Sequence, residues 1–567
     1  MKKVLSAATA LILLTVSLSL CSTAFAKENS LCFAVASDLH YNEPREELEI
    51  YDDSDAIFGY ANRRAAMEDE SGFIIDSFLN ECAENDGIEF VLISGDICDN
   101  GRWRGDVDHP AVAEKFRKFE RETGKKIFVT NGNHDTGAGE NDYTNEDFRR
   151  DYYEFGFDEA IAEMDGNLSY VAELDSKYRL IVCDSCDPHS STEDGLTADR
   201  VNWVCKMAKQ AVSDGKYPVL MMHHNFVDHM PVQRLLSHNF IVRNHTLTAA
   251  RFANAGIRLA FTGHEHGNDV ASYTSLAGNK IYDFSTTSLT MYPLSYRIMT
   301  LTDDNIEYKS KTVEKIDTSA LTEATKGYTE KQTAFMNTDL NEYSKQFLKQ
   351  GIKYRLKLGF TMEKMGVKEG SVFYPLVSSA VGRLVEILEM PLYGEESVSS
   401  LASEYNIALP QSEYENGWDV VTELMAAHYA GDEPFATDSP EVQLILKTGV
   451  LILHDDLSNV NDNVLFGAAN EILKNFGMGD CFTKVTKLCA GVFGPYTAGE
   501  CFIAAVASPI VYGFCLDGSA PDNNGVIEGY LGNANTANVK ARIKNFFEKI
   551  MIYTKLFLGY LSKVFVR

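Results

Sequence analysis

The stretch KIFVTNGNHD, residues 126–135, joins a short apolar run to a polar tail that contains asparagine, histidine and aspartate. Runs of about five residues rich in Val, Ile, Leu and Phe are typical of strands buried on both faces. The tail begins where such a strand would end, which is where open α/β folds place their functional loops. The segment therefore predicts a strand followed directly by a site loop.

The same combination recurs along the first half of the chain. Its composition, 45% apolar and 23% charged, is that of a globular protein and excludes a disordered or fibrous one. Strand-like runs alternate with helical patterns, which favours a layered α/β architecture. The strand-like runs are 31–37, 90–94, 126–130, 179–183, 218–222, 258–262, 280–284, 295–302 and 306–310, and the helical patterns are 73–85, 111–123 and 197–213.

Five polar groups that follow these runs contain metal-ligating side chains: DLH, GDICD, GNHD, HH and GHEH. Imidazole and carboxylate together suit zinc, iron and manganese, and an amide oxygen is a harder, weaker ligand. In an extended segment, residues two apart point to the same side, so both ends of DLH can reach one cluster. Gly95, Gly132 and Gly263 are expected to let the backbone turn sharply beside the ions. The candidate ligands are Asp38, His40, Asp96, Asn133, His223, His264 and His266, enough for two ions that share one carboxylate.

This series of motifs resembles the calcineurin-like metallophosphoesterase superfamily over roughly residues 31 to 312. The resemblance implies a two-sheet β-sandwich flanked by helices, with a dinuclear centre at one edge. It implies two divalent or trivalent ions drawn from Mn, Fe and Zn, without selecting the pair. It prefers His223 over His224, because the first histidine after the strand usually takes that position. The implied ligands are Asp38, His40 and His266 for the first metal, Asn133, His223 and His264 for the second, and Asp96 as the bridge.

The resemblance also implies a catalytic histidine, His134, that touches the phosphate and the leaving group. Asp135 is expected to orient His134, and Asp99 to lie just outside the ligands. The predicted reaction is hydrolysis of a phosphodiester or phosphomonoester by in-line attack of a metal-bridging hydroxide, with the ions offsetting the substrate's charge. His134 would protonate the departing oxygen or stabilise charge there. The candidate substrates are an extracellular nucleotide, a phospholipid head group or a wall polymer.

Two other functions stay open at the level of sequence. The first is a cell-surface binding protein with a vestigial metal site, although such a site should have lost at least one of the seven ligands. The second is a metal-dependent nuclease, which the acidic balance disfavours. The 52 Lys and Arg residues against 81 Asp and Glu leave a net charge of −29, which repels polyphosphate backbones. The sequence therefore favours a metal-dependent phosphoric ester hydrolase over a nuclease, and it argues against a nucleic-acid partner.

Two polar stretches, 41–72 and 102–110, depart from the family pattern. The first is equally compatible with a substrate lid and with a solvated surface excursion. The second is expected to bring Trp103, Arg104 and His109 near the rim of the site. Three further histidines either line the pocket or, as is more common, lie at the surface: His229, His238 and His245.

The chain is long enough for two to four domains, and its character changes near residue 313. Residues 27–312 are predicted to form the phosphoesterase-like domain, and 313–538 a helical domain of unknown role. Within the latter, 496–515 is apolar enough for a membrane span, but its charge and proline favour a buried helix. Residues 539–567 predict a basic amphipathic helix of net charge +6. It would lie on an anionic membrane or wall surface, or pack on its own acidic domain.

Residues 1–26 have the pattern of a signal peptide. Two lysines precede the apolar run 4–20, and the sequence AFA at 24–26 supplies the small-x-small cleavage motif. Cleavage is expected after Ala26, and the protein is expected to be secreted or at the cell surface. A lipoprotein anchor at Cys21 and a retained membrane anchor are the less favoured alternatives.

Eleven cysteines occur in the chain, of which ten follow the expected cleavage site. An oxidising compartment permits disulfides, although a chain of this length does not need them. Cys183 and Cys186 form a CxxC motif without the second pair of a zinc knuckle. They are interpreted as a local disulfide or two free thiols.

Overall fold

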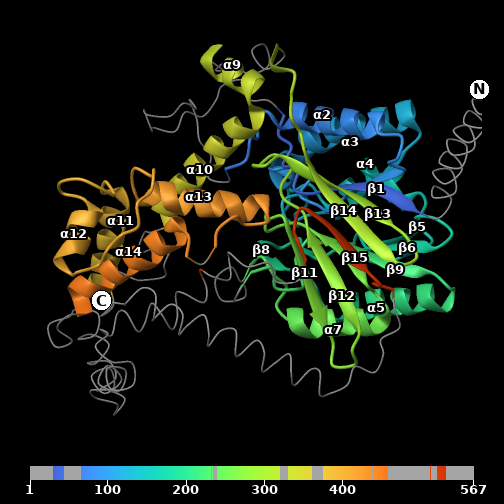
Figure 1. Ribbon diagram of the computed structural model, residues 1–567. Helices are drawn as coiled ribbons and strands as arrows, with labels where there is room; N and C mark the ends of the chain where they lie inside the picture. The colour runs from blue at the N-terminus through green and yellow to red at the C-terminus, as the bar shows by residue number, and fades with distance from the viewer. Residues whose placement is uncertain are drawn as a thin grey trace, which may run out of the picture.

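The apolar runs of the first half form two mixed β-sheets, which Figure 1 shows in the computed structural model of the protein. Phe33 of one sheet and Phe261 of the other meet edge to face, with ring centroids 5.6 Å apart. The sheets therefore pack against one another, and the predicted two-sheet sandwich flanked by helices is confirmed. The structure describes residues 30–43, 65–230, 233, 239–319, 330–359, 374–436, 438–457, 511 and 520–531.

The first sheet has six strands. In order across the sheet they are β15 (Asn524–Glu528), β14 (Asn305–Thr312), β13 (Ser295–Leu301), β1 (Leu31–Ala36), β2 (Phe90–Ile93) and β3 (Lys126–Val129). Strands β1, β2 and β3 are parallel, whereas β13, β14 and β15 pair antiparallel on the other side of β1. Because β1, β2 and β3 end at the same edge, the polar residues that follow them lie together.

The second sheet has seven strands. In order they are β11 (Asp269–Thr274), β12 (Lys280–Ser285), β10 (Leu259–Thr262), β9 (Tyr217–Met222), β6 (Tyr178–Cys183), β5 (Tyr170–Glu173) and β4 (Ala162–Glu163). Strands β6, β9, β10 and β12 are parallel, so the polar residues after β9 and β10 also share an edge. A separate hairpin consists of β7 (Cys186–Asp187) and β8 (Ser190–Asp194).

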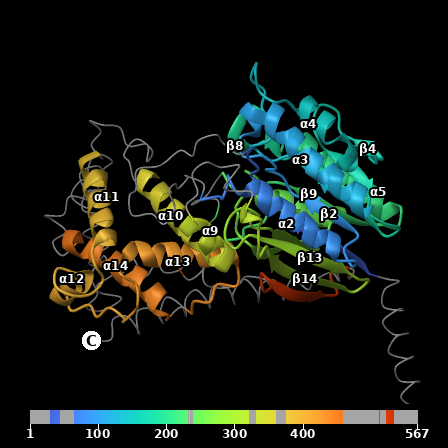
Figure 2. The ribbon, with the colours of Figure 1, turned by 90° about the horizontal axis from the view of Figure 1, so that it is seen from above.

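Helices cover the outer faces of the sandwich (Figures 1 and 2). Helices α2 (Ser71–Glu84) and α3 (Gly101–Thr123) lie over the first sheet, where Phe78 meets Tyr296 of β13 with centroids 4.8 Å apart. Helices α5 (Ala198–Ser213) and α7 (His245–Ala255) pack on the second sheet through a buried apolar cluster. The short helix α4 (Asn145–Asp151) and the turn η1 (Tyr153–Phe157) complete this part.

The described residues beyond 313 are mostly helical, as predicted. The helices are α9 (Glu330–Thr338), α10 (Leu340–Gly359), α11 (Tyr374–Glu389), α12 (Val398–Glu404), α13 (Gly417–Ala430) and α14 (Pro440–Leu457). Their own apolar cluster includes Ile387, Val398, Val420 and Leu444. We refer to α9–α14 as the helical part.

The helical part and the sandwich share an apolar cluster. Helices α10 and α13 contribute to it together with residues 65–66 and 291 of the first part. In addition, β15 pairs with β14, so a segment from far along the chain completes the first sheet. Its sequence, NGVIE, contains only two adjacent apolar residues and carries too weak a pattern to predict a strand.

One predicted helix begins earlier than expected. Residues 102–110 are the first turns of α3, not an insertion, and the helix continues through Pro110. The proline is what obscures this in the sequence, because it lacks an N–H and normally ends a helix. Within α3, Trp103 is 67% exposed whereas His109 is fully buried.

Several predictions fall outside the described residues: the signal peptide 1–26, residues 44–64 of the stretch 41–72, His238, most of 496–515, and 539–567. Among the described residues, no helix combines the length and the apolar character needed to cross a membrane.

Candidate metal centre

The structure brings all seven candidate ligands together. Two groups share Asp96: Asp38, His40, Asp96 and His266 form one, and Asp96, His223 and His264 form the other, all buried except the partly exposed His266. Within each group, one ligand atom of every residue lies within 4.8 Å of the others. Asn133 adjoins the second group, because its Oδ1 lies 3.0 Å from His223 Nε2. The shared carboxylate is what a bridge between two ions requires.

The backbone is strained at most of these positions. Five of the seven candidates have a positive φ: Asp38, His40, Asp96, His264 and His266, with values from 42° to 68°. They are half of the ten non-glycine residues with positive φ in the described chain. Such conformations are costly, persist only where surrounding contacts enforce them, and cluster at functional sites.

Two glycines leave room for the carboxylates. A Cβ on Gly132 would meet Asp96 Oδ1 at 2.0 Å, and one on Gly263 would meet Asp38 Oδ2 at 2.3 Å. Only Gly95 of the three predicted turn glycines has a left-handed φ, +100°. The expectation that all three permit sharp turns is therefore wrong for Gly132 and Gly263, which are needed for close approach.

In the first group, an ion-pair contact places one nitrogen of His40 against Asp99 and the other toward the ligands. Its Nδ1 lies 3.1 Å from Asp99 Oδ1, so Asp99 has the predicted place just outside the ligands. A neutral imidazole that keeps its proton on Nδ1, the atom facing Asp99, has its lone pair on Nε2. That atom faces His266 Nε2 at 3.0 Å, and His266 Nε2 lies 3.2 Å from Asp38 Oδ1.

The second group is oriented in the same way. His223 Nδ1 donates to the Ser94 carbonyl at 2.9 Å, which leaves Nε2 to face Asp96 Oδ2 at 3.3 Å. Asn133 Nδ2 donates to the Ser191 carbonyl at 2.9 Å and so directs Oδ1 toward His223. His224 lies outside the group, with Nδ1 2.9 Å from Ser185 Oγ.

Charge in the centre is balanced among carboxylates and imidazoles. Burial alone raises the pKa of Asp38, but His266 and His223 more than offset it and lower the pKa to about 2. Burial lowers the pKa of His223, but Asp96 and Asp38 raise it to about 9. Among the described residues, the ion-pair partners of Asp38 and Asp96 are all histidines, and none is Lys or Arg. The cationic partners are therefore groups that can exchange a proton for a metal ion.

Residues 32–268 match the family model of the calcineurin-like phosphoesterases. This part of the chain is similar to the calcineurin-like phosphoesterases.

The chain is also similar to solved structures at low sequence identity. A dimetal phosphatase from Danio rerio is 12% identical, with 50% of this chain and 97% of that one covered and a TM-score of 0.35. A 5′-nucleotidase precursor from Thermus thermophilus is 12% identical, with coverages of 52% and 57% and a TM-score of 0.32. An NAD nucleotidase from Haemophilus influenzae is 10% identical, with coverages of 59% and 61% and a TM-score of 0.28. A search among curated proteins gave no match.

Members of this family typically bind two metal ions, and the donors present fit such a pair. Two nitrogen ligands about 2.0–2.1 Å from one ion lie about 3 Å apart when the angle between them is near 90°. The Nε2 atoms of His40 and His266 have this separation. Imidazole and carboxylate donors with one amide oxygen suit zinc, iron or manganese. The centre formed by these two ligand groups is therefore a suitable site for two ions.

His134 lies at the edge of the centre, but Asp135 does not orient its ring. His134 Nδ1 lies 3.0 Å from the Asp99 carbonyl, which makes that carbonyl the orienting acceptor. The Asp135 carboxylate points away from the rim and accepts N–H bonds from Ile97, Cys98 and Gly132 at 3.2, 2.9 and 2.7 Å. The predicted role of Asp135 is therefore corrected: it joins the loops after β2 and β3. Burial and Asp96 raise the pKa of Asp135 to about 7.

Arg102 is a supporting residue that the sequence did not reveal. Its Nε donates to the Asn133 carbonyl at 3.0 Å, and its Nη2 donates to the carbonyls of Asp187 and Ser190 at 2.9 and 3.0 Å. It thus ties the backbone of a candidate ligand to the β7–β8 hairpin. No local motif marks it, because its partners are backbone oxygens distant in sequence.

The remaining sequence candidates do not join the metal centre. His109 lies beneath it, with Nδ1 2.9 Å from Tyr152 Oη and 3.2 Å from Cys98 Sγ. His229 is buried between Asp269 and Asp283, at 2.6 and 3.2 Å. His109 and His229 thus serve the interior, whereas Trp103 is exposed. Cys183 and Cys186 are both buried free thiols, so the local disulfide does not form.

Proposed function

We propose that this chain is an exported, metal-dependent hydrolase of phosphodiesters or phosphomonoesters. The observation that carries the proposal is the pair of ligand groups joined at Asp96, at the strand ends of the part of the chain that is similar to the calcineurin-like phosphoesterases. Asp96 would bridge the two ions. Asp38, His40 and His266 would hold the first ion, and Asn133, His223 and His264 the second.

Two ions bound there would supply positive charge to the phosphate oxygens and lower the pKa of a coordinated water. The chain's own residues provide the precise geometry that such chemistry needs. The His134 backbone N–H donates to Asp96 Oδ1 at 2.8 Å and holds the shared carboxylate in place. Asn133 is fixed by Ser191 and Arg102. The ligands are therefore supported before a substrate arrives.

His134 is the proposed proton donor to the leaving group. Its Nδ1–H is committed to the Asp99 carbonyl, so Nε2 is the atom that can exchange a proton. Nε2 lies 4.0 Å from Asp96 Oδ2, and the side chain is 23% exposed. This ring is therefore accessible to a substrate phosphate while remaining next to the bridging carboxylate.

The test uses residues 27–567, stripped of metal and reloaded with manganese, zinc or iron. Hydrolysis of a chromogenic phosphodiester is compared with that of its monoester, with Asp96→Asn and His134→Ala as variants. We expect metal-dependent turnover that both variants lose, and the ratio of diester to monoester rates then selects the ester class. Absence of metal binding would overturn the proposal and favour a binding protein with a vestigial site. Preferential cleavage of single-stranded DNA or RNA would favour a nuclease.

Export and surface contact form a separate part of the proposal, supported by the pattern of residues 1–26 and the basic pattern of 539–567. The N-terminal residue of the protein recovered outside cells should be Lys27. Deletion of 539–567 should move the protein from the cell surface to the culture medium. Equal partitioning of the two forms between the cell surface and the medium would indicate that residues 539–567 have only a structural role.

A further inference from the structure

The loop after β10, residues 263–268, carries His264 and His266 and is contacted by the helical part. Glu265 stands between the two histidines, and its Oε1 lies 3.9 Å from Nε2 of His428, near the end of α13. The other nitrogen of His428, Nδ1, lies 3.0 Å from Glu433 Oε1. His428 is thus an ionic bridge between the helical part and the metal-ligand loop.

This bridge is buried. Glu265 and His428 are each 8% exposed, and Glu265 Oε2 accepts a bond from Gln233 Nε2 at 2.8 Å. Burial lowers the pKa of His428, but Glu265 and Glu433 more than offset this and raise it to about 10. His428 is therefore a cation at neutral pH. A buried carboxylate is costly unless it is paired, and among the described residues His428 is the ion-pair partner of Glu265.

The backbone of α13 contacts the same loop. The Tyr429 carbonyl accepts the Asn268 N–H at 3.2 Å, two residues beyond His266. Gly431, which ends the helix with φ +73°, approaches so closely that an added Cβ would lie 2.3 Å from the Asn268 carbonyl. A residue with a side chain could not take this place without moving the helix or the loop.

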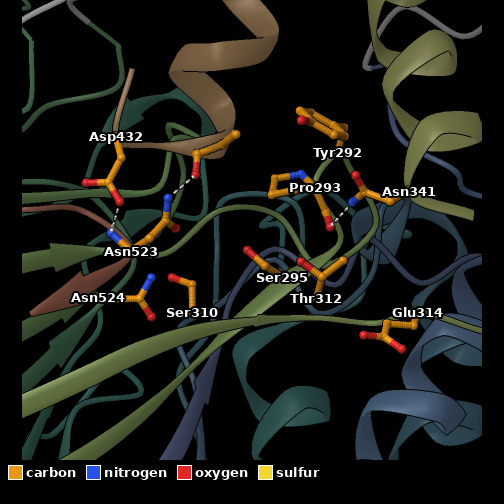
Figure 3. A pocket seen from close by; sticks show the side chains of 11 residues that line it. Tyr292, Pro293, Ser295, Ser310, Thr312, Glu314, Asn341, Asp432, Asn523 and Asn524 are labelled. Carbon is orange, nitrogen blue, oxygen red and sulfur yellow. Dashed lines mark hydrogen bonds between the residues drawn. The ribbon is translucent and has the colours of Figure 1, made fainter. Parts of the chain in front are cut away.

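The end of α13 is itself fixed to the sandwich. Asp432 accepts N–H bonds from Asp522 and Asn523, at 2.6 and 3.1 Å, and donates its own N–H to Asp522 Oδ2 at 2.8 Å. Asn523 Nδ2 donates to the Ala430 carbonyl at 2.9 Å. Figure 3 shows Asp432 and Asn523 together at a polar cleft of about 510 Å³ between the two parts. The helix end is therefore held on both sides.

We propose that His428 is a positioning residue for the metal centre: through Glu265 it holds the loop in which His264 and His266 are ligands. This inference rests on the proposed function, because it requires that the loop bind metal. Both histidines have left-handed φ values, 68° and 64°, which the loop sequence alone would not favour. Packing of α13 against the loop is a contact that enforces them. The helical part would thereby set the affinity and geometry of the centre.

The test compares His428→Ala and His428→Gln in the chain 27–567. Mn²⁺ affinity is measured by titration calorimetry, and ligand geometry by the visible absorption of the Co²⁺-loaded protein. Removing supports outside the ligand shell typically costs about 10–100-fold in affinity, so we expect about tenfold weaker Mn²⁺ binding and an altered Co²⁺ spectrum for His428→Ala. His428→Gln keeps a hydrogen-bonding group and should recover part of both.

Glu423→Gln is the matched control, because Glu423 lies on the same helix and pairs with Lys345 and Lys349 instead of the loop. It should bind metal like the unmodified chain. Gly431→Ala, which disturbs the loop by contact instead of charge, should resemble His428→Ala.

The outcomes separate this inference from the proposed function. An unmodified chain that binds no metal would overturn both. Metal binding by the unmodified chain, with unchanged affinity and Co²⁺ spectrum in the His428 variants, would overturn the positioning role alone. Loss of folded circular dichroism in both His428 variants would assign the residue to folding and would also overturn the positioning role.

Discussion

The loops that carry the candidate ligands are held by different parts of the molecule. We call the loops after β1, β2 and β3 one half of the candidate centre and the loop after β10 the other half; this division differs from that into two ligand groups. The loops after β1, β2 and β3 support one another: the His40 N–H donates to the Asp96 carbonyl at 3.0 Å, and Asp135 binds the loop after β2. The loop after β10 receives contacts from α13 of the helical part. One half is thus built within a single run of βαβ units, whereas the other is contacted by residues far along the chain.

Asp96→Asn should have the largest effect, because Asp96 belongs to both ligand groups. Since outer supports alone are worth about 10–100-fold, loss of the bridging charge should lower activity by more than about a hundredfold. Metal content by mass spectrometry should fall from two ions to one or none. His189→Gln is the control, because His189 is exposed on the β7–β8 hairpin, lies outside both groups and should leave two ions bound. Two ions retained by Asp96→Asn would contradict the bridge.

His134→Ala should lower kcat by about 10²–10⁴-fold, the usual contribution of a positioned acid. Both halves of the centre should stay intact, so metal content should not change. The loss should shrink for substrates with very acidic leaving groups, which need no proton. His189→Ala, an exposed histidine on the β7–β8 hairpin, should leave kcat unchanged. Equal losses for good and poor leaving groups would argue against proton donation.

Gly132→Ala should damage the half that is built within the sandwich. Its Cβ would meet Asp96 Oδ1 at 2.0 Å, and overpacking of this kind costs about 1–3 kcal/mol. Denaturant unfolding should show this loss, together with weaker metal binding. Gly382→Ala, with open space around the site on α11, should not destabilise the protein. Similar unfolding midpoints for both variants would contradict the packing argument.

Glu423→Gln should have the smallest effect, about 1 kcal/mol, and only within the helical part. Burial raises the pKa of Glu423, but Lys345 and Lys349 more than offset the effect of burial, so the pKa is lowered overall. The carboxylate therefore contributes stability above its unfolded pKa of about 4.5, and that stability is lost as pH falls through the lower folded pKa. Unfolding of both proteins at pH 7 and pH 3 tests this. A difference that does not shrink between pH 7 and pH 3 would exclude the ion pairs as its source.

Much of the sandwich was predictable because its central strands are buried on both faces. The runs at 31–37, 90–94 and 126–130 correspond to β1, β2 and β3 within one residue at either end. Short strands with polar sequences, such as β8 with SSTED and β15 with NGVIE, lack that signal. Their pairing is decided by neighbouring strands, and no pattern within them indicates it.

The candidate ligands could be predicted because each follows a strand whose end is fixed by the parallel sheet. The orientation of side chains around them could not. Asp135 follows His134 directly, yet its carboxylate binds backbone N–H groups of another loop while the Asp99 carbonyl orients the imidazole. Adjacency in sequence therefore misassigned the partner.

The sequence by itself predicted a layered α/β architecture and seven candidate ligand positions, because strand periodicity and ligand chemistry are local properties of a segment. The two-sheet class was implied by the family resemblance that those motifs carry. Only the tertiary structure decided that Gly132 and Gly263 serve close approach and that β15 completes the first sheet. It also decided that His428 meets Glu265. These contacts join segments distant along the chain, and they arise from the packing of whole elements, which no short stretch of sequence encodes.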